Sequence, residues 1–352
     1  MSIPFIPPAT AFTAVLNGKN SGLWVLQNSL ISCAITNYGA RLVSLIVSDK
    51  QGDRTDVMLG YSSLKEYISA SDAYYGAIVG RYANRIANGT FTLDGIHYRL
   101  PINNDPNTLH GGPYGFHARV WTVVRASDTL IELRYFSADN EEGFPGNMEV
   151  VVTYELIENE LHIHYNASTD KPTVINLSNH TYFNLNGEGN GSINAHTLQI
   201  AADTYTPVDE TLIPTGELAS VSGTPFDFRH PRTIGYLLHS ADEQLKYAGG
   251  YDHNFVLAAT AGKPQITITG DKSCITMSIL TDQPGMQFYG GNAMSGKDVG
   301  KSGRVYGRQH AFVLEPQHFP DSPNHSSFPD TTLRPGDVFT STSVYSFTHS
   351  GK

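Results

Sequence analysis

The sequence has few cysteines, and this shortage excludes several kinds of site. Only Cys33 and Cys274 occur among 352 residues, far apart and in no CxxC pattern. Such a pattern carries no zinc signature and no disulfide framework, although it leaves a single bridge between the two cysteines open. We expect reduced, buried thiols in a cytoplasmic protein.

Charged residues are also scarce, at 16% of the chain, and acidic residues outnumber basic ones by 33 to 23, for a net charge of −10. This balance disfavours nucleic acid or an anionic membrane surface as a partner. Since no apolar run reaches the roughly 18 residues of a membrane-spanning helix, we expect no membrane span. The first eight residues contain three prolines and no basic residue, which is not the pattern of a signal peptide.

Several catalytic signatures are missing as well. The sequence contains no GxGxxG, Walker A, HExxH or GxSxG motif. Dinucleotide binding, P-loop nucleotide binding, zinc-protease chemistry and serine hydrolysis therefore have no support.

Glycine, proline, tyrosine and phenylalanine are abundant, with 33, 19, 19 and 16 residues. This composition is typical of short strands joined by turns. Asp94-Gly95 predicts a hairpin, and helices are expected only at 62–70 and 233–246. Strands are expected within 22–47 and over 129–136, 149–156, 160–167 and 338–347. We predict one all-β domain over residues 1–352, a large antiparallel sandwich.

Residues 175–187 mix short polar side chains with aromatic ones around His180. A buried strand end favours apolar residues, whereas a solvated loop has no need of the Tyr182-Phe183 pair. A sugar-sized ligand suits this mixture, because its hydroxyls need hydrogen bonds and its CH faces need flat apolar partners. The alternative is a strand end whose histidine is satisfied by neighbouring amides.

Other segments add polar groups of the same kind. Asn84 and Arg85 lie in a small-residue segment, where an arginine either reaches solvent or serves a pocket. His110 precedes two glycines that allow close backbone approach. Glu315 follows three apolar residues, an expensive place for a charge unless it points to water.

His162 and His164 are expected on one face of a strand, opposite a core-like face. Their spacing suits a metal, but no third ligand is indicated, so we predict a polar strand face and no metal. A histidine and a carboxylate elsewhere in the chain can act together as a general acid and base without a cofactor.

Six motifs, in order along nearly the whole chain, resemble the galactose mutarotase (aldose 1-epimerase) family. They are GRYANRI at 80–86, LHGG at 109–112, NLSNHTYFNL at 176–185, YDHNFVL at 251–257, GMQFYGGN at 285–292 and LEPQHFP at 314–320. The resemblance implies a β-supersandwich with few short helices. It also implies interconversion of the α and β anomers of free aldoses such as galactose and glucose, with no metal or organic cofactor.

The resemblance implies roles residue by residue. His180 is the expected general acid and Glu315 the general base. Substrate-binding roles are expected for Asn84, Arg85, His110, Tyr182, Asp252 and Gln287. Pro316 departs from the family pattern, in which a threonine is often found.

In this chemistry Glu315 takes a proton from the anomeric hydroxyl while His180 gives one to the ring oxygen, and we expect the nearby carboxylate to favour imidazolium at His180.

Two alternatives are an epimerase of hexose 6-phosphates, which needs extra basic residues, and a non-catalytic sugar-binding module, which needs neither His180 nor Glu315. We expect a monomer or a weak homodimer.

Overall fold

The computed structural model describes residues 6–260 and 262–349. Within them the chain is built mostly of antiparallel strands with two short α-helices, so the predicted all-β class is confirmed. No helix in these two ranges is long and apolar enough to cross a membrane.

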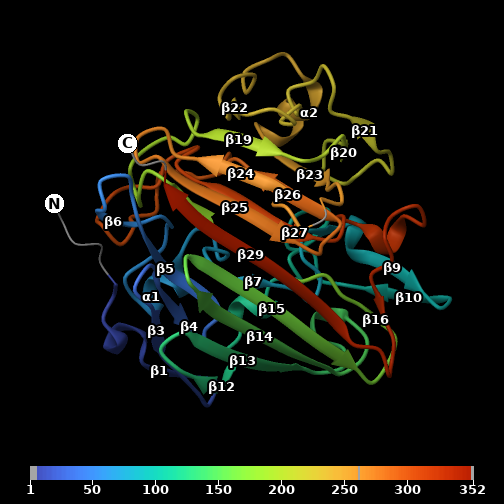
Figure 1. The fold of residues 1–352 in the computed structure, drawn as a ribbon. Coiled ribbons are helices and arrows are strands. Elements are labelled where there is room, and N and C mark those ends of the chain that lie inside the picture. Colours follow the sequence, from blue (N-terminus) through green and yellow to red (C-terminus); the bar gives the residue numbers. More distant parts are fainter. Residues whose placement is uncertain (1–5, 261, 350–352) are drawn as a thin grey trace.

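The largest sheet has nine strands. In spatial order they are β12 (Thr122–Ala126), β13 (Leu130–Ser137), β14 (Met148–Ile157), β15 (Glu160–Thr169), β29 (Phe339–His349), β25 (Ile275–Thr281), β24 (Ile266–Thr269), β19 (Thr197–Ile200) and β22 (Arg232–Thr233). The late strand β29 lies between β15 and β25, which joins the two halves of the sheet (Figure 1). The strands predicted over 129–167 and 338–347 are therefore neighbours.

A six-stranded sheet carries several of the predicted site residues. Its order is β18 (Tyr182–Phe183), β27 (Phe312–Gln317), β26 (Gly285–Tyr289), β23 (Asp252–Val256), β20 (Thr204–Thr206) and β21 (Ala219–Ser220). A four-stranded sheet follows the order β3 (Leu23–Gln27), β4 (Ser32–Thr36), β5 (Arg41–Ser48) and β6 (Arg54–Asp56), as predicted within 22–47.

Short strand pairs and turns complete the fold. The pairs are β1 (Ala14–Leu16) with β2 (Lys19–Ser21), β9 (Thr90–Leu93) with β10 (Ile96–Arg99), β8 (Arg85–Ile86) with β11 (Thr108–Leu109), β7 (Ile78–Val79) with β17 (Ser178–Asn179), and β16 (Thr173–Val174) with β28 (Thr332–Leu333). The 3-10 turns are Ala9–Phe12, Ala87–Gly89, Phe116–Ala118, Glu141–Gly143 and Ser322–Asn324. The β9–β10 pair is the predicted Asp94-Gly95 hairpin.

The core lies between the large sheets because their strands alternate. Val150, Val152 and Tyr154 of β14 are fully buried, and they belong to the same apolar cluster as Phe312 and Leu314 of β27. Burying each such side chain contributes about 1.5–3 kcal/mol. Neighbours along a strand point to opposite faces. Val313 and Glu315 of β27 therefore point away from this core.

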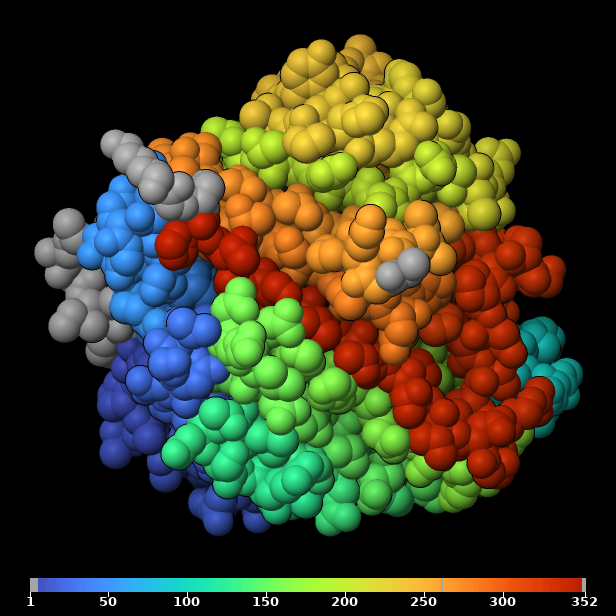
Figure 2. Space-filling view, viewed as in Figure 1, coloured from blue at the N-terminus to red at the C-terminus, as the bar shows by residue number. Residues whose placement is uncertain are grey.

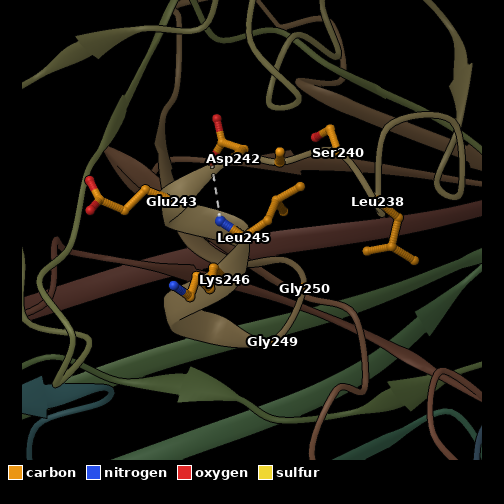
Figure 3. Close-up of a pocket in the computed structure, with 9 residues that line it drawn as sticks. Leu238, Ser240, Asp242, Glu243, Leu245, Lys246, Gly249 and Gly250 are labelled. Carbon is orange, nitrogen blue, oxygen red and sulfur yellow. Dashed lines mark hydrogen bonds between the residues drawn. The ribbon is translucent and has the colours of Figure 1, made fainter.

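The two helices test the sequence predictions differently. Helix α1 (Leu64–Ser69) begins after Ser63, whose side chain accepts the N–H of Glu66, as predicted for 62–70. The helix predicted at 233–246 is wrong: 232–233 form β22, and α2 (Glu243–Ala248) begins only after Asp242 caps it (Figure 3). Asp242 accepts the N–H groups of Gln244 and Leu245, so the capping residue sets the start. The segment that carries α2 forms the yellow lobe beside the sheet (Figure 2).

The cysteines are both free, which removes the bridge left open by the sequence. Cys33 is buried, as expected, and burial raises the pKa of its thiol far above the usual range. Cys274 is partly exposed, so the expectation of two buried thiols holds for Cys33 alone.

Candidate active site

The six-stranded sheet presents polar side chains on the face that points away from the core. Gln287 on β26 lies directly opposite Glu315 on β27, and Asp252 on β23 lies opposite Tyr289, two residues further along β26. Tyr182 on β18 pairs with β27 two residues before Glu315. Because directly paired residues and residues two apart share a face, all five point to the same side of the sheet.

Three short segments bring further predicted residues over this face. Asn84 precedes β8, His110 follows β11, and β8 and β11 pair with each other. His180 lies between β17 and β18. Its backbone is fixed on both sides, since its N–H donates to the carbonyl of Ala77 and its carbonyl accepts the N–H of Gly76.

Together these residues line a cavity of about 710 Å³. Its lining includes seven of the eight predicted residues: Asn84, Arg85, His110, His180, Tyr182, Asp252 and Glu315. Gln287 stands behind this lining, where its amide donates to Asp252 Oδ1 at 2.6 Å. In this structure Gln287 therefore orients Asp252 and does not line the cavity itself.

His180 and Glu315 form the central pair, with His180 Nε2 3.7 Å from Glu315 Oε1. Their side chains are 6% and 2% exposed. Within the described residues, His180 Nδ1 and Glu315 Oε2 have no hydrogen-bond partner. Two alternatives left open by the sequence are therefore wrong. Among the described residues no amide bonds to His180 Nδ1, and the Glu315 side chain is buried and does not point to water.

Burial dominates the electrostatics of this pair. It raises the pKa of Glu315 well above the usual range, and the negative charge of Asp252 adds to the rise. It lowers the pKa of His180, against the opposing influence of Asp72. The expectation that the Glu315 carboxylate makes His180 an imidazolium is wrong for this structure, because desolvation penalises both charged forms. Burial therefore favours the neutral form of each group, the carboxyl of Glu315 and the imidazole of His180.

His110 is held as a neutral hydrogen-bond donor. Its Nδ1 accepts the backbone N–H of Asn84 at 3.1 Å, so its hydrogen must lie on Nε2. Burial, followed by the charges of His180 and Arg85, lowers the pKa of His110 well below the usual range. Its ring is 5.0 Å from that of His180, at 84°. His110 can therefore donate from Nε2 to an oxygen of a ligand.

Arg85 is buried, so the alternative that it reaches solvent is wrong. Its Nη1 lies 3.7 Å from Asp252 Oδ2, and its Nε donates to Asn104 Oδ1 at 2.9 Å. The side-chain oxygen of Asn84 accepts the N–H of Arg85 at 2.8 Å. Asn84 has a φ of 65°, a left-handed conformation that asparagine tolerates better than most residues. The guanidinium is thus fixed beside the cavity.

The donor atoms of His110, His180 and Glu315 lie within 4.8 Å of one another, a spacing that could hold a metal ion. The chemistry of His110 opposes this, because an imidazole that accepts at Nδ1 carries its hydrogen on Nε2 and keeps no lone pair for a metal. Two protein ligands then remain among these three, fewer than a catalytic zinc site uses.

Strand β27 continues through Pro316, which pairs in register with Met286 of β26. On its other side, β18 pairs only with Val313 and Phe312. The missing N–H of Pro316 therefore removes no bond to β18, and its carbonyl accepts the hydroxyl of Ser178 at 2.9 Å. The departure from the family pattern leaves Glu315 on a regular strand.

Sequence reasoning missed Asp72, Tyr74, Tyr75 and Tyr289, which also line the cavity. The Tyr74 ring lies 4.6 Å from His110 and 5.6 Å from His180. The Ser-Asp-Ala-Tyr-Tyr segment has the same mixture of polar and aromatic residues as 175–187, which is the signal that could have found it.

A separate cavity of about 580 Å³ lies beside α2 (Figure 3). Its lining comes from residues 238–250 and includes Asp242, Glu243 and Lys246 but no histidine or tyrosine. It lacks the flat aromatic walls and the buried acid–base pair of the larger cavity.

Comparison with known proteins shows the family of the chain. Residues 22–346 match the family model of aldose 1-epimerase. Galactose mutarotase from Homo sapiens is 44% identical over 323 residues, which are 92% of each chain. Aldose 1-epimerase from Escherichia coli (strain K12) is 38% identical over 337 residues, 94% of this chain and 96% of that one.

Two solved structures have the same fold. A GalM/aldose epimerase homologue from C. elegans has a TM-score of 0.85 and 34% identity, covering 94% of this chain and 99% of its own. A galactose 1-epimerase from Lactobacillus acidophilus NCFM has a TM-score of 0.84 and 30% identity, covering 96% and 97%.

Proposed function

Because the chain belongs to the aldose 1-epimerase family, we propose that it interconverts the α and β anomers of a free aldose such as galactose or glucose, with His180 and Glu315 as the acid–base pair. The observation that carries the proposal is this pair, buried and 3.7 Å apart in a polar-aromatic cavity. The enzyme is an isomerase.

In the proposed reaction the base form of Glu315 removes the proton of the anomeric hydroxyl. His180 donates a proton to the ring oxygen as the bond between that oxygen and C1 breaks. The open aldehyde turns about its C1–C2 bond, and the ring oxygen attacks the other face of C1. The two proton transfers then run in reverse, so the pair returns to its starting state and no other reactant is consumed.

The reactive arrangement needs the proton on His180 and the charge on Glu315. Burial opposes this charged arrangement, because it favours the neutral form of each group. The sugar supports the reactive form, because its anomeric hydroxyl donates to a carboxylate and its ring oxygen accepts from an imidazolium. Each positioned proton transfer contributes roughly 100- to 10,000-fold to the rate.

The remaining groups are suited to holding a sugar. In the proposal Arg85 and the Nε2 hydrogen of His110 donate to sugar oxygens, and Asp252 accepts from a hydroxyl. The rings of Tyr74 and Tyr182 supply flat apolar surface. Asn84 holds His110 and Arg85 through its backbone and side chain.

The charge of the cavity argues against hexose 6-phosphates. Its lining contains the carboxyl groups of Asp72, Asp252, Asp298 and Glu315 but only Arg85 and Lys297 as permanent cations. A phosphate group would meet this excess of acidic groups. The sugar-binding module is disfavoured because a buried carboxyl group without a hydrogen-bond partner is costly unless it has a function.

We extend the proposal to a cytoplasmic enzyme, supported by the two free cysteines, and to a monomer or weak homodimer. Analytical ultracentrifugation tests the oligomeric state, and a stable larger assembly would overturn that part.

Polarimetry of freshly dissolved α-D-galactose and α-D-glucose tests the function. We expect faster mutarotation with enzyme, unchanged by EDTA, and no acceleration with glucose 6-phosphate. Sugar binding in calorimetry without acceleration would identify a binding module. Loss of activity in EDTA with recovery in a divalent metal would overturn the metal-free mechanism.

A further inference from the structure

Asp72 contacts two tyrosines that flank His180. Its Oδ2 accepts the hydroxyl hydrogen of Tyr182, and its Oδ1 accepts the backbone N–H of Tyr74 at 2.9 Å. The Tyr182 ring lies 5.1 Å from the His180 ring, and the Tyr74 ring lies 5.6 Å from it. One carboxylate thus bonds to both tyrosines that flank the imidazole.

The segment that carries Asp72 is itself fixed to the site. The buried guanidinium of Arg41 donates to the carbonyls of Ala73 and Tyr75, at 3.1 and 2.8 Å. The Tyr75 ring packs against that of Tyr182, with centroids 4.3 Å apart and planes tilted by 31°. Since Gly76 and Ala77 bind the backbone of His180, residues 72–77 support His180 from its backbone and from its ring.

The hydroxyl of Tyr182 is therefore already engaged within the protein. Bonded to Asp72, it has its only hydrogen committed and faces a carboxylate rather than a sugar hydroxyl. By contrast, among residues 6–260 and 262–349 no hydrogen-bond partner of His180 Nδ1 is present to orient its ring. Packing against its aromatic neighbours therefore helps to fix the orientation of the ring.

We propose that Asp72 is a positioning residue: it holds Tyr182, and through that ring His180, in the orientation that proton transfer to the sugar ring oxygen requires. This inference rests on the proposed function, because it assigns Asp72 a part in the same proton transfer. In this role Asp72 acts through its bond to Tyr182, although its side chain also lines the cavity.

The test is a double-mutant cycle of Asp72→Asn, Tyr182→Phe and the double variant, with kcat and KM for mutarotation of α-D-galactose. Each single variant should lose about tenfold in kcat with KM changed less than about twofold, because ground-state contacts to the sugar remain. Both substitutions remove the same bond between Asp72 and Tyr182, so their effects should not add. The kcat of the double variant should therefore lie within about threefold of that of the slower single variant.

A pH profile separates positioning from a general structural role. The charged or titratable groups around His180 are Glu315 on β27, Asp252 on β23, Arg41 on β5, and Asp72, His110, His117, Tyr74 and Tyr182. Asp72 opposes the lowering of the His180 pKa, so Asp72→Asn should lower that pKa further and move the alkaline limb of activity to lower pH. Tyr182→Phe keeps the carboxylate and should leave this limb within about 0.3 pH unit.

Asp330→Asn is the matched control. Asp330 accepts the N–H of Thr332, two residues on, at 2.9 Å, as Asp72 accepts that of Tyr74, but it lies outside the cavity lining. The mutarotation activity of Asp330→Asn should equal that of the wild type.

The outcomes separate the inference from the proposed function. An inactive wild type would overturn the proposed function. An active wild type with normal kcat in Asp72→Asn, or with Tyr182→Phe raising KM alone, would overturn the positioning role. If Asp72→Asn does not fold, Tyr182→Phe alone decides: its kcat loss at unchanged KM supports the role, and normal kcat overturns it.

Discussion

Two pairs of histidines in this protein have similar ring separations and different surroundings. The His110 and His180 rings lie 5.0 Å apart, and those of His162 and His164 lie 5.8 Å apart. The first pair comes from segments far apart in sequence and is buried in the cavity. The second lies two residues apart on β15, half-buried, with Glu160 and Thr342 as partners.

The difference shows that spacing along a strand is a weaker sign of function than convergence of distant segments. His162 bonds a carboxylate that is 34% exposed, so water screens the contact. His180 faces a carboxyl group that is 2% exposed, where desolvation changes the proton affinity of both partners. The same side chain is a polar surface group in one place and a candidate acid in the other.

The largest expected effect comes from removing the proposed base. Glu315→Gln keeps the shape and the hydrogen-bonding capacity of the side chain but accepts no proton at neutral pH. Mutarotation should fall about 100-fold or more while sugar affinity changes modestly. Polarimetry and calorimetry on the same folded preparation check this.

Near wild-type turnover in Glu315→Gln would show that Glu315 is not the base. Asp271→Asn is a useful control, because it changes a carboxylate that contacts a different histidine, His196, at 3.2 Å. It should leave mutarotation within about twofold, as expected of a change outside the reacting groups.

A smaller loss should follow removal of the sugar-holding groups. Arg85→Ala and His110→Ala each remove donors from the cavity wall, and a hydrogen bond from a charged group contributes about 1.5–3 kcal/mol. We expect kcat/KM for Arg85→Ala to fall roughly 10- to 100-fold, and His110→Ala to lose less because its donor is neutral. Steady-state polarimetry checks both, and unchanged kcat/KM in either variant would remove that residue from the sugar site.

The pH dependence sharpens the comparison further. Activity should follow a bell, because at low pH both members of the pair are protonated and no base remains, whereas at high pH both are deprotonated and no acid remains. The two limbs belong to the pair rather than to single residues. In Glu315→Gln only the limb that falls as pH rises through the pKa of His180 should persist.

A flat wild-type profile from about pH 5 to 9, where the reference values predict titration, would argue against the pair. Measuring kcat/KM with two sugars at each pH identifies a rate-limiting step other than proton transfer. The pH dependence of kcat/KM reports the pKa values of the free enzyme, which are the same for both sugars, so limbs that differ between sugars come from another step.

The smallest effect is expected at the strand histidines. His162→Ala removes a partly exposed ring and its contact with Glu160, so activity should stay within about twofold, as for surface positions generally. A loss as large as that of Arg85→Ala would mean that the cavity is not the site of the reaction.

The sequence predicted most of the strands, because alternation and turn residues act locally. It missed the α2 boundary, since the apolar spacing of 233–246 resembles a helix while the cap at Asp242 and the pairing of β22 decide where the helix begins. It also missed Asp72, whose contact with Tyr182 joins residues 110 positions apart. Proton affinities were the hardest to predict, because the burial of Glu315 and His180 depends on the complete fold.

The most direct test compares His180→Asn with His164→Asn in one polarimetric assay at saturating α-D-galactose. An amide cannot protonate the ring oxygen, so His180→Asn should lose about 100-fold or more, whereas the same change on β15 should leave the rate within about twofold. Circular dichroism of both variants verifies the fold. Comparable rates for the two folded variants would contradict the assignment of His180 as the acid.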